Sequence, residues 1–150
     1  MRSKFFGILA ILLFFVACGH RNDIERANVQ LGQLYDNMLD MDYSDISIEQ
    51  LDSLIDVFSS EGECRCEAVC RLIKGAKLYG HKDGSRAIEE LKYAEQYIAD
   101  EDIEAGRLYY YLSRILAVDN PHQSDYYARR LVVWADEYED VEMLAFGNKL

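Results

Sequence analysis

The sequence predicts an all-α fold built of helix-turn-helix pairs. Apolar side chains recur at steps of three and four residues, as they do on the buried face of an amphipathic helix. Alternating polar and apolar runs, which are typical of strands, are absent from the sequence. The single proline, Pro121, and the lack of a Gly/Ser-rich tract indicate one domain without a linker. The apolar stripes lie in residues 24–38, 48–58, 69–79, 88–97, 105–115 and 127–138, and residues 141–144 begin a last short segment.

Three serines stand where helices are expected to begin. Ser47 and Gln50 form a capping-box pattern, in which each side chain bonds a free backbone amide at the start of the helix. Ser85 and Ser124 occupy predicted N-cap positions ahead of the fourth and sixth stripes. These positions predict where three of the helices start.

Glycine and proline mark the predicted helix ends. Gly80 and Gly84 bracket a turn between the third and fourth stripes. Asn120 and Pro121 are expected to stop the fifth helix, because the residue before a proline avoids the helical conformation. The elements therefore follow one another as three pairs and a terminal helix.

Each pair carries a small residue in the middle of its first helix, at Gly32, Gly75 and Ser113. A side chain without bulk lets a neighbouring helix come close, since the distance between helix axes depends on the side chains at the contact. The second helices of the later two pairs share a seven-residue alanine spacing, which also predicts a close contact. These alanines are Ala87 and Ala94 in one pair and Ala128 and Ala135 in the next.

This pattern resembles the tetratricopeptide repeat, a helix-turn-helix unit that stacks into a right-handed superhelix. The resemblance covers residues 24–138, and residues 141–150 would form a terminal helix without a partner. The small residues follow one another at intervals longer than the family's repeat of about 34 residues. Insertions are therefore expected at Asp40–Ser47 and Asp119–Ser124. A plain helical bundle is the alternative architecture.

The start of the chain has the features of a secretory signal. Arg2 and Lys4 precede an apolar run from Phe5 to Ala17, which is too short for a spanning helix. Cys18 follows, and the sequence Val-Ala-Cys-Gly resembles the lipobox of bacterial lipoproteins. In that family the signal is cut before the cysteine, whose thiol takes a diacylglycerol, so the resemblance implies lipid attachment at Cys18. An ordinary cleaved signal peptide is the alternative.

The expected organisation is a signal peptide in residues 1–17, a lipid-anchored tether in 18–22 and a helical repeat domain in 23–150. A lipobox together with degenerate repeats resembles the tetratricopeptide-repeat lipoproteins of the Bacteroides-type bacterial envelope. The resemblance implies a module that is anchored to a membrane by lipid, faces the periplasm and mediates protein–protein interaction without catalysis or a cofactor. An accessory lipoprotein of an envelope-assembly machine is an alternative.

The charge of the chain argues against a nucleic-acid partner. It carries 27 acidic and 16 basic residues, for a formal net charge of -11. Loss of the signal would remove two basic residues and no acid, which makes the remaining chain more acidic. Phosphate backbones require a basic footprint, and anionic lipid headgroups require basic clusters. The expected contact with a membrane is therefore through the lipid anchor.

The sequence contains no recognisable catalytic motif. His20, His81 and His122 lie away from any nucleophile motif, and a Gly-rich phosphate-binding loop is absent from the sequence. The acidic run Asp100–Asp102 falls in a predicted turn, where nothing in the sequence indicates the burial that tunes a catalytic carboxylate. We therefore expect a protein that is not an enzyme.

Three cysteines form the one cluster with possible chemistry. Cys64, Cys66 and Cys70 do not match the CxxC spacing of zinc knuckles. Cys66 and Cys70 lie one helical turn apart on a stripe that continues to Ile73, so packing as small apolar side chains is the favoured interpretation. A disulfide, or a metal site completed by His81, is the alternative. Either would make the chain a thiol-dependent redox or metal-binding lipoprotein.

The candidate partner-binding residues are Arg107, Tyr110 and Arg114. They lie at three- and four-residue steps on the fifth helix, and arginine and tyrosine dominate binding hot spots. With them we expect a groove that holds an acidic or amphipathic segment of an unknown protein partner. The opposite face, around Tyr126 and Trp134, is the second candidate. In the preceding pair the groove would be lined by Val69, Leu72, Ala76 and Tyr79.

Overall fold

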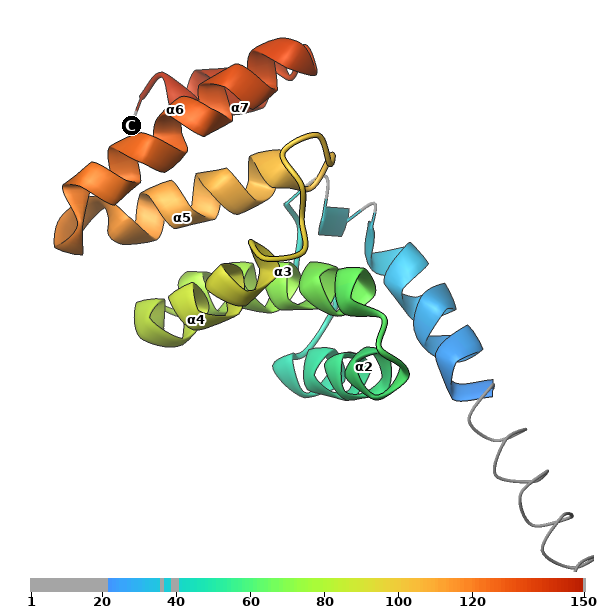
Figure 1. Cartoon of the computed structure of the whole chain (residues 1–150). Helices are drawn as coiled ribbons and strands as arrows, with labels where there is room; N and C mark the ends of the chain where they lie inside the picture. The colour runs from blue at the N-terminus through green and yellow to red at the C-terminus, as the bar shows by residue number, and fades with distance from the viewer. Residues whose placement is uncertain (1–21, 36, 39–40, 150) are drawn as a thin grey trace, which may run out of the picture.

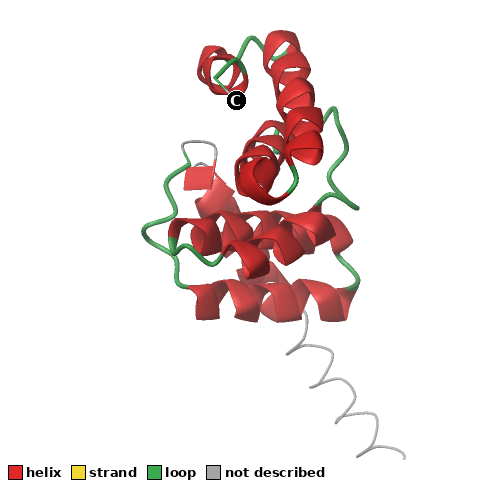
Figure 2. Ribbon diagram, turned by 90° about the vertical axis from the view of Figure 1, so that its left-hand side faces the viewer, coloured by secondary structure: helices red, strands yellow, loops and turns green. Residues whose placement is uncertain are grey.

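The structure is a computed structural model that describes residues 22–35, 37–38 and 41–149 (Figure 1). Every regular element in these residues is an α-helix, so the predicted all-α class is confirmed (Figure 2). The expected signal peptide and Cys18 lie outside the described residues. A first helix covers residues 22–35. It is followed by α2 (Ile48–Glu61), α3 (Cys64–Gly80), α4 (Gly84–Ala94), α5 (Ala105–Asp119), α6 (Pro121–Glu137) and α7 (Val141–Gly147).

Consecutive helices form pairs that stack along the chain. The most extensive contacts join α3 to α4 and α5 to α6, which are the second and third predicted pairs. Helix α2 packs on α3, α7 packs on α6, and α5 contacts both α3 and α7. The first helix of one pair therefore touches the first helix of the next, as expected for stacked helix-turn-helix units.

The predicted apolar stripes form a single core. Leu51, Leu72, Leu91, Leu108 and Leu131, one from each of α2 to α6, are fully buried in it. Burial of a leucine side chain contributes about 1.5–3 kcal/mol, which is why the stripes determine which face of each helix turns inward. A pocket of about 420 Å³ lies in the first pair, where described residues of the first helix, of the turn ahead of α2 and of α2 itself line it.

The small residue of the second pair lies at a close helix contact. A Cβ built on Gly75 would stand 2.7 Å from Leu91 Cγ and 3.1 Å from the Ala87 carbonyl oxygen of α4. The four predicted alanines of α4 and α6 are buried as well. Gly32 differs, because a Cβ there would meet no described atom within 4 Å, and the residue is exposed. The prediction of a close contact at Gly32 is wrong.

One of the three predicted N-caps is confirmed. The Ser47 hydroxyl accepts from the amide of Gln50, whose side chain accepts from the amide of Ser47, which completes the capping box. Helix α4 is instead capped by Asp83, and α6 by Asn120. Ser85 and Ser124 lie inside these helices. An Asn placed directly before Pro121 starts the helix earlier, because proline suits the first helical position.

The same cap corrects the position of an expected insertion. Asn120 is both the last cap of α5 and the first cap of α6, so the two helices are joined by one residue. The extra length lies instead in residues 95–104, between α4 and α5, which we call the interpair turn. The other insertion agrees with prediction, because residues 41–47 form turns ahead of α2.

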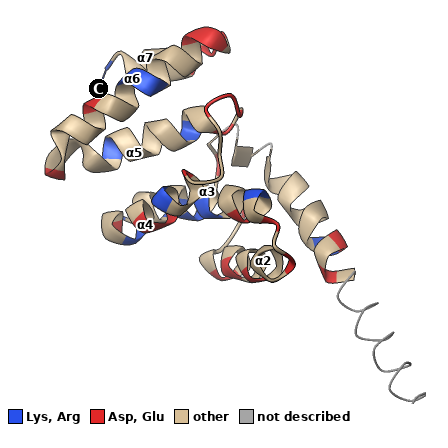
Figure 3. Cartoon of the chain, in the orientation of Figure 1, with Lys and Arg blue, Asp and Glu red and all other residues tan. Residues whose placement is uncertain are grey.

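The interpair turn is tied to the helices on both sides of it. Arg65 at the start of α3 pairs with Asp102 and donates to both carboxylate oxygens of Glu104, at 2.9 and 3.0 Å. From α6, the Trp134 indole donates to the Asp102 carbonyl oxygen at 3.0 Å, and Tyr138 donates to that of Glu101. Acidic residues are frequent in this turn and near the end of α6 (Figure 3).

Candidate functional site

The three predicted partner-binding residues do not share one exposed face. Arg107 is only 8% exposed, and its Nη1 atom donates to Asp140 Oδ2 at 3.2 Å. Its guanidinium also lies 5.8 Å from the centre of the Trp134 ring. This side chain links α5 to the turn between α6 and α7. Tyr110 is partly exposed and Arg114 is exposed, so these two remain accessible on α5.

Tyr110 and Arg114 are joined by aromatic side chains from the neighbouring pairs. Phe146 of α7 packs on Tyr110 with ring centroids 5.0 Å apart. A side-chain hydrogen bond with Tyr79 of α3 raises the pKa of Arg114, which keeps its positive charge in place. Three helices therefore contribute to this surface, namely α3, α5 and the terminal helix α7. We call its four residues, Tyr79, Tyr110, Arg114 and Phe146, the aromatic face.

The apolar strip expected beside this face is not a groove. Val69, Leu72 and Ala76 are buried in the core. Helix α3 is in contact with α2, α4 and α5, so little of its circumference is left for a ligand. Of the four residues expected on this helix, Tyr79 alone is partly exposed.

The three cysteines span a range of burial along the first turns of α3. Cys64 is exposed, Cys66 is partly buried and Cys70 is buried, and all three thiols are free. Burial raises the pKa of Cys70 to about 12. A thiol with such a pKa stays protonated at neutral pH and is a poor nucleophile and metal ligand. In the described residues no three His, Cys, Asp or Glu side chains are grouped to hold a metal.

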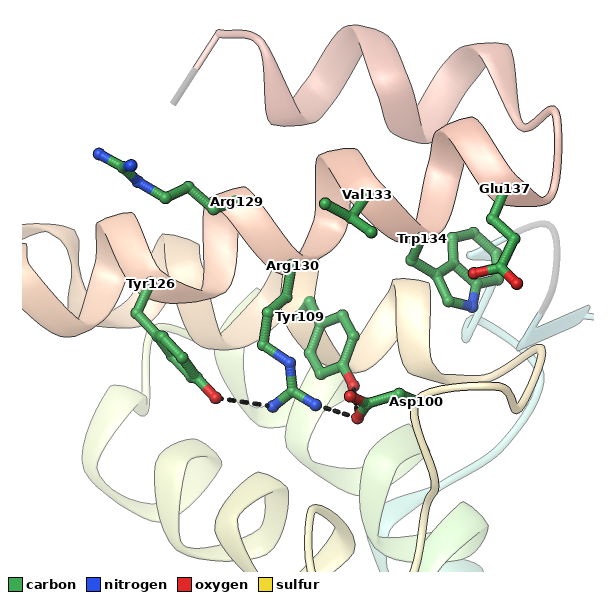
Figure 4. Close-up of a pocket in the computed structure, with 8 residues that line it drawn as sticks. All are labelled: Asp100, Tyr109, Tyr126, Arg129, Arg130, Val133, Trp134 and Glu137. Carbon is green, nitrogen blue, oxygen red and sulfur yellow. Dashed lines mark hydrogen bonds and ion pairs between the residues drawn. The ribbon is translucent and has the colours of Figure 1, made fainter.

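The second candidate face carries a pocket of about 260 Å³ on the outer side of α6 (Figure 4). Tyr126 and Val133 border it and are 52% and 67% exposed. Trp134 forms one wall of the pocket, yet most of its side chain is buried. Its indole packs directly on Gly106 of α5, where any Cβ would collide with the ring. The pocket is open to solvent, and its surface is mostly apolar although charged side chains border it.

Arg130 connects the pocket to the interpair turn. Its guanidinium lies 4.4 Å from the centre of the Tyr109 ring and donates to the Tyr126 hydroxyl at 3.2 Å. It also pairs with Asp100, which accepts a hydrogen bond of 2.6 Å from the Tyr109 hydroxyl (Figure 4). Burial and the bond to Asp100 raise the pKa of Tyr109, so its phenol remains a donor. These mutual bonds fix the floor of the pocket.

The contacts of Arg65, Arg107 and Arg130 were not predictable from spacing. Each arginine reaches an acid at least 30 residues away in the chain. The contact between Gly106 and Trp134 did have a signal in the sequence, because a glycine within a helix often marks a place where a large neighbour approaches.

Comparisons with protein families, curated proteins and solved structures found no match for this chain. Among the described helices, none has the length and apolar character needed to cross a bilayer.

Proposed function

We propose that this chain is a non-catalytic helical repeat module that binds a segment of another protein, while lipid on Cys18 holds it to a membrane of the cell envelope. The observation that carries the proposal is the aromatic face. It presents two partly exposed tyrosines, a phenylalanine and an arginine from the three helices α3, α5 and α7. Continuous faces of this kind are what stacked repeats use to hold extended partners.

The chemistry of the face favours an acidic or amphipathic segment. Tyrosine and arginine bury area while still offering polar ends, and they are enriched among the residues that dominate binding energy. Arg114 is positive in a chain with a formal charge of -11, so it provides a local attraction for a carboxylate that the rest of the surface repels. The rings of Tyr110 and Phe146 would hold an apolar side chain next to that carboxylate.

The binding part of the proposal is tested with a double variant, Tyr110→Ala with Arg114→Ala, in the full chain. Capture of cross-linked partner from envelope membranes should fall by at least about tenfold, while helical content and melting temperature stay close to wild type. The matched control is Tyr97→Ala with Arg86→Ala, which removes an exposed tyrosine and an exposed arginine elsewhere. Equal capture by wild type and by the folded double variant would contradict the proposal.

The anchoring part has its own experiment. Replacing Cys18 with alanine should abolish incorporation of labelled fatty acid and move the protein from the membrane to the soluble fraction. Cys64→Ala is the control, since it removes an exposed thiol from the helical part without touching the lipobox. Continued lipid labelling of the Cys18→Ala protein would place the anchor elsewhere.

A further inference from the structure

The residues of α6 that line the pocket have the spacing at which one helix packs on another. In packed helices, a side chain of one helix inserts between four residues of the other, spaced at i, i+3, i+4 and i+7. The six α6 residues that line the pocket make two consecutive sets with this spacing. The two sets are Tyr126, Arg129, Arg130, Val133 and Arg130, Val133, Trp134, Glu137.

This face of α6 is also ready to bind without rearrangement. Arg130 is held by Tyr109, Tyr126 and Asp100, so the floor does not have to be ordered when a partner arrives. Val133 stands exposed at the centre of the face. A preformed surface avoids part of the ordering cost of association.

The charges on the face are arranged symmetrically about Val133. Arg129 lies four residues before it and Glu137 four residues after it. In an antiparallel pair of identical helices crossing at Val133, the arginine of each copy would stand opposite the glutamate of the other. Among the described residues Arg129 pairs with Asp125, and both side chains are highly exposed, so this bond contributes little.

We propose that this face of α6 binds the same face of a second copy of the chain, in an antiparallel arrangement with Val133 at the two-fold axis. Arg129 of one copy then pairs with the partner's Glu137, and the reverse pair forms on the other side. One helix face falls short of the roughly 1,200 Å² that stable interfaces bury. The dimer is therefore weak, and it is detected by trapping or at high protein concentration.

The first test traps the axis. Val133→Cys is introduced into the full chain in which Cys64 and Cys66 are serine, and mild oxidation is followed on a non-reducing gel. A disulfide-linked dimer is expected for Val133→Cys. The control is Val118→Cys, which is also highly exposed but lies near the end of α5. Equal cross-linking at both positions, or no dimer at Val133→Cys, would overturn the proposal, as would an adduct with a different protein only.

The second test reads the pairing of charges. Arg129→Glu and Glu137→Arg should each reduce the yield of the Val133→Cys dimer by about tenfold, because each places like charges opposite one another. The two changes together should restore it. The rescue reports contact between copies, since residues 129 and 137 are about 12 Å apart along one helix and do not pair within it. Two defective single variants without rescue would overturn the antiparallel register.

Discussion

The hydroxyl of Ser124 in α6 donates a hydrogen bond of 2.8 Å to the backbone carbonyl oxygen of Ser113 in α5. Both residues are small and buried, and the bond joins the two helices of the third pair. Ser113 was expected to allow close approach because it is small. In the structure its backbone carbonyl oxygen also accepts a hydrogen bond from the neighbouring helix.

We expect Ser113→Leu to lower the free energy of unfolding by about 1–3 kcal/mol, because the added bulk has to enter a packed contact between α5 and α6. Chemical denaturation followed by circular dichroism measures this. Ser85→Leu is the matched control, since Ser85 is an exposed residue inside α4 and its change should stay within about 0.5 kcal/mol. A neutral Ser113→Leu would mean that α5 and α6 are further apart than described.

Glycine substitutions separate a close contact from an open one. Gly75→Leu should destabilise the protein by about 1–3 kcal/mol, because its side chain would displace Leu91 and press on the Ala87 backbone. Gly32→Ala should instead stabilise it by about 0.5–1 kcal/mol, since the new methyl group meets nothing described and alanine favours the helix. Thermal melts of both variants provide the comparison, and two changes of the same sign would contradict it.

These two glycines also show how far the sequence could predict the structure. Periodicity is a local property, so it identified the helices, their buried faces and the contact at Gly75. It could not say which part of a helix a distant neighbour covers. Gly32 and Gly75 have similar local settings, yet only the second meets a partner helix.

The candidate site was predictable only in part for the same reason. Tyr110 and Arg114 are accessible as expected, but Arg107 on the same stripe is covered by the turn that leads into α7. Asn120 caps α6 in place of Ser124, and the extra length expected before α6 lies instead in the interpair turn, which supplies Asp100 to Arg130. Such placements depend on contacts between segments far apart in the chain.

The stability of the protein should decline at alkaline pH. Burial raises the pKa of Cys70 to about 12, from a value of 9.0 for an unperturbed thiol, and burial likewise raises the pKa of Tyr43 to about 12. At a pH between the unperturbed and the raised pKa of such a group, the unfolded chain has lost a proton that the folded chain keeps. The free energy of unfolding therefore falls as pH rises from about 9 to 12.

Cys70→Val tests this explanation, because valine fills a similar volume and has no proton to lose. Urea denaturation at intervals from about pH 8 to 11 should show a shallower decline for Cys70→Val than for wild type. Cys64→Val is the control, since Cys64 is exposed. Identical slopes for Cys70→Val and wild type would show that the buried thiol does not contribute to the decline.

The last prediction separates the two arginines that were expected to act together. Arg107→Ala should lower the free energy of unfolding by about 1–3 kcal/mol, because Asp140 Oδ2 loses the hydrogen bond from Arg107 and the covered space beside Trp134 is left unfilled. Arg114→Ala should leave stability within about 0.5 kcal/mol, since its side chain is exposed. Capture of a protein partner should change in the opposite order, falling for Arg114→Ala and staying near wild type for Arg107→Ala at a temperature where both are folded. If Arg107→Ala is as stable as wild type and fails to capture the partner, Arg107 belongs to the binding surface and the ion pair with Asp140 opens when the partner binds.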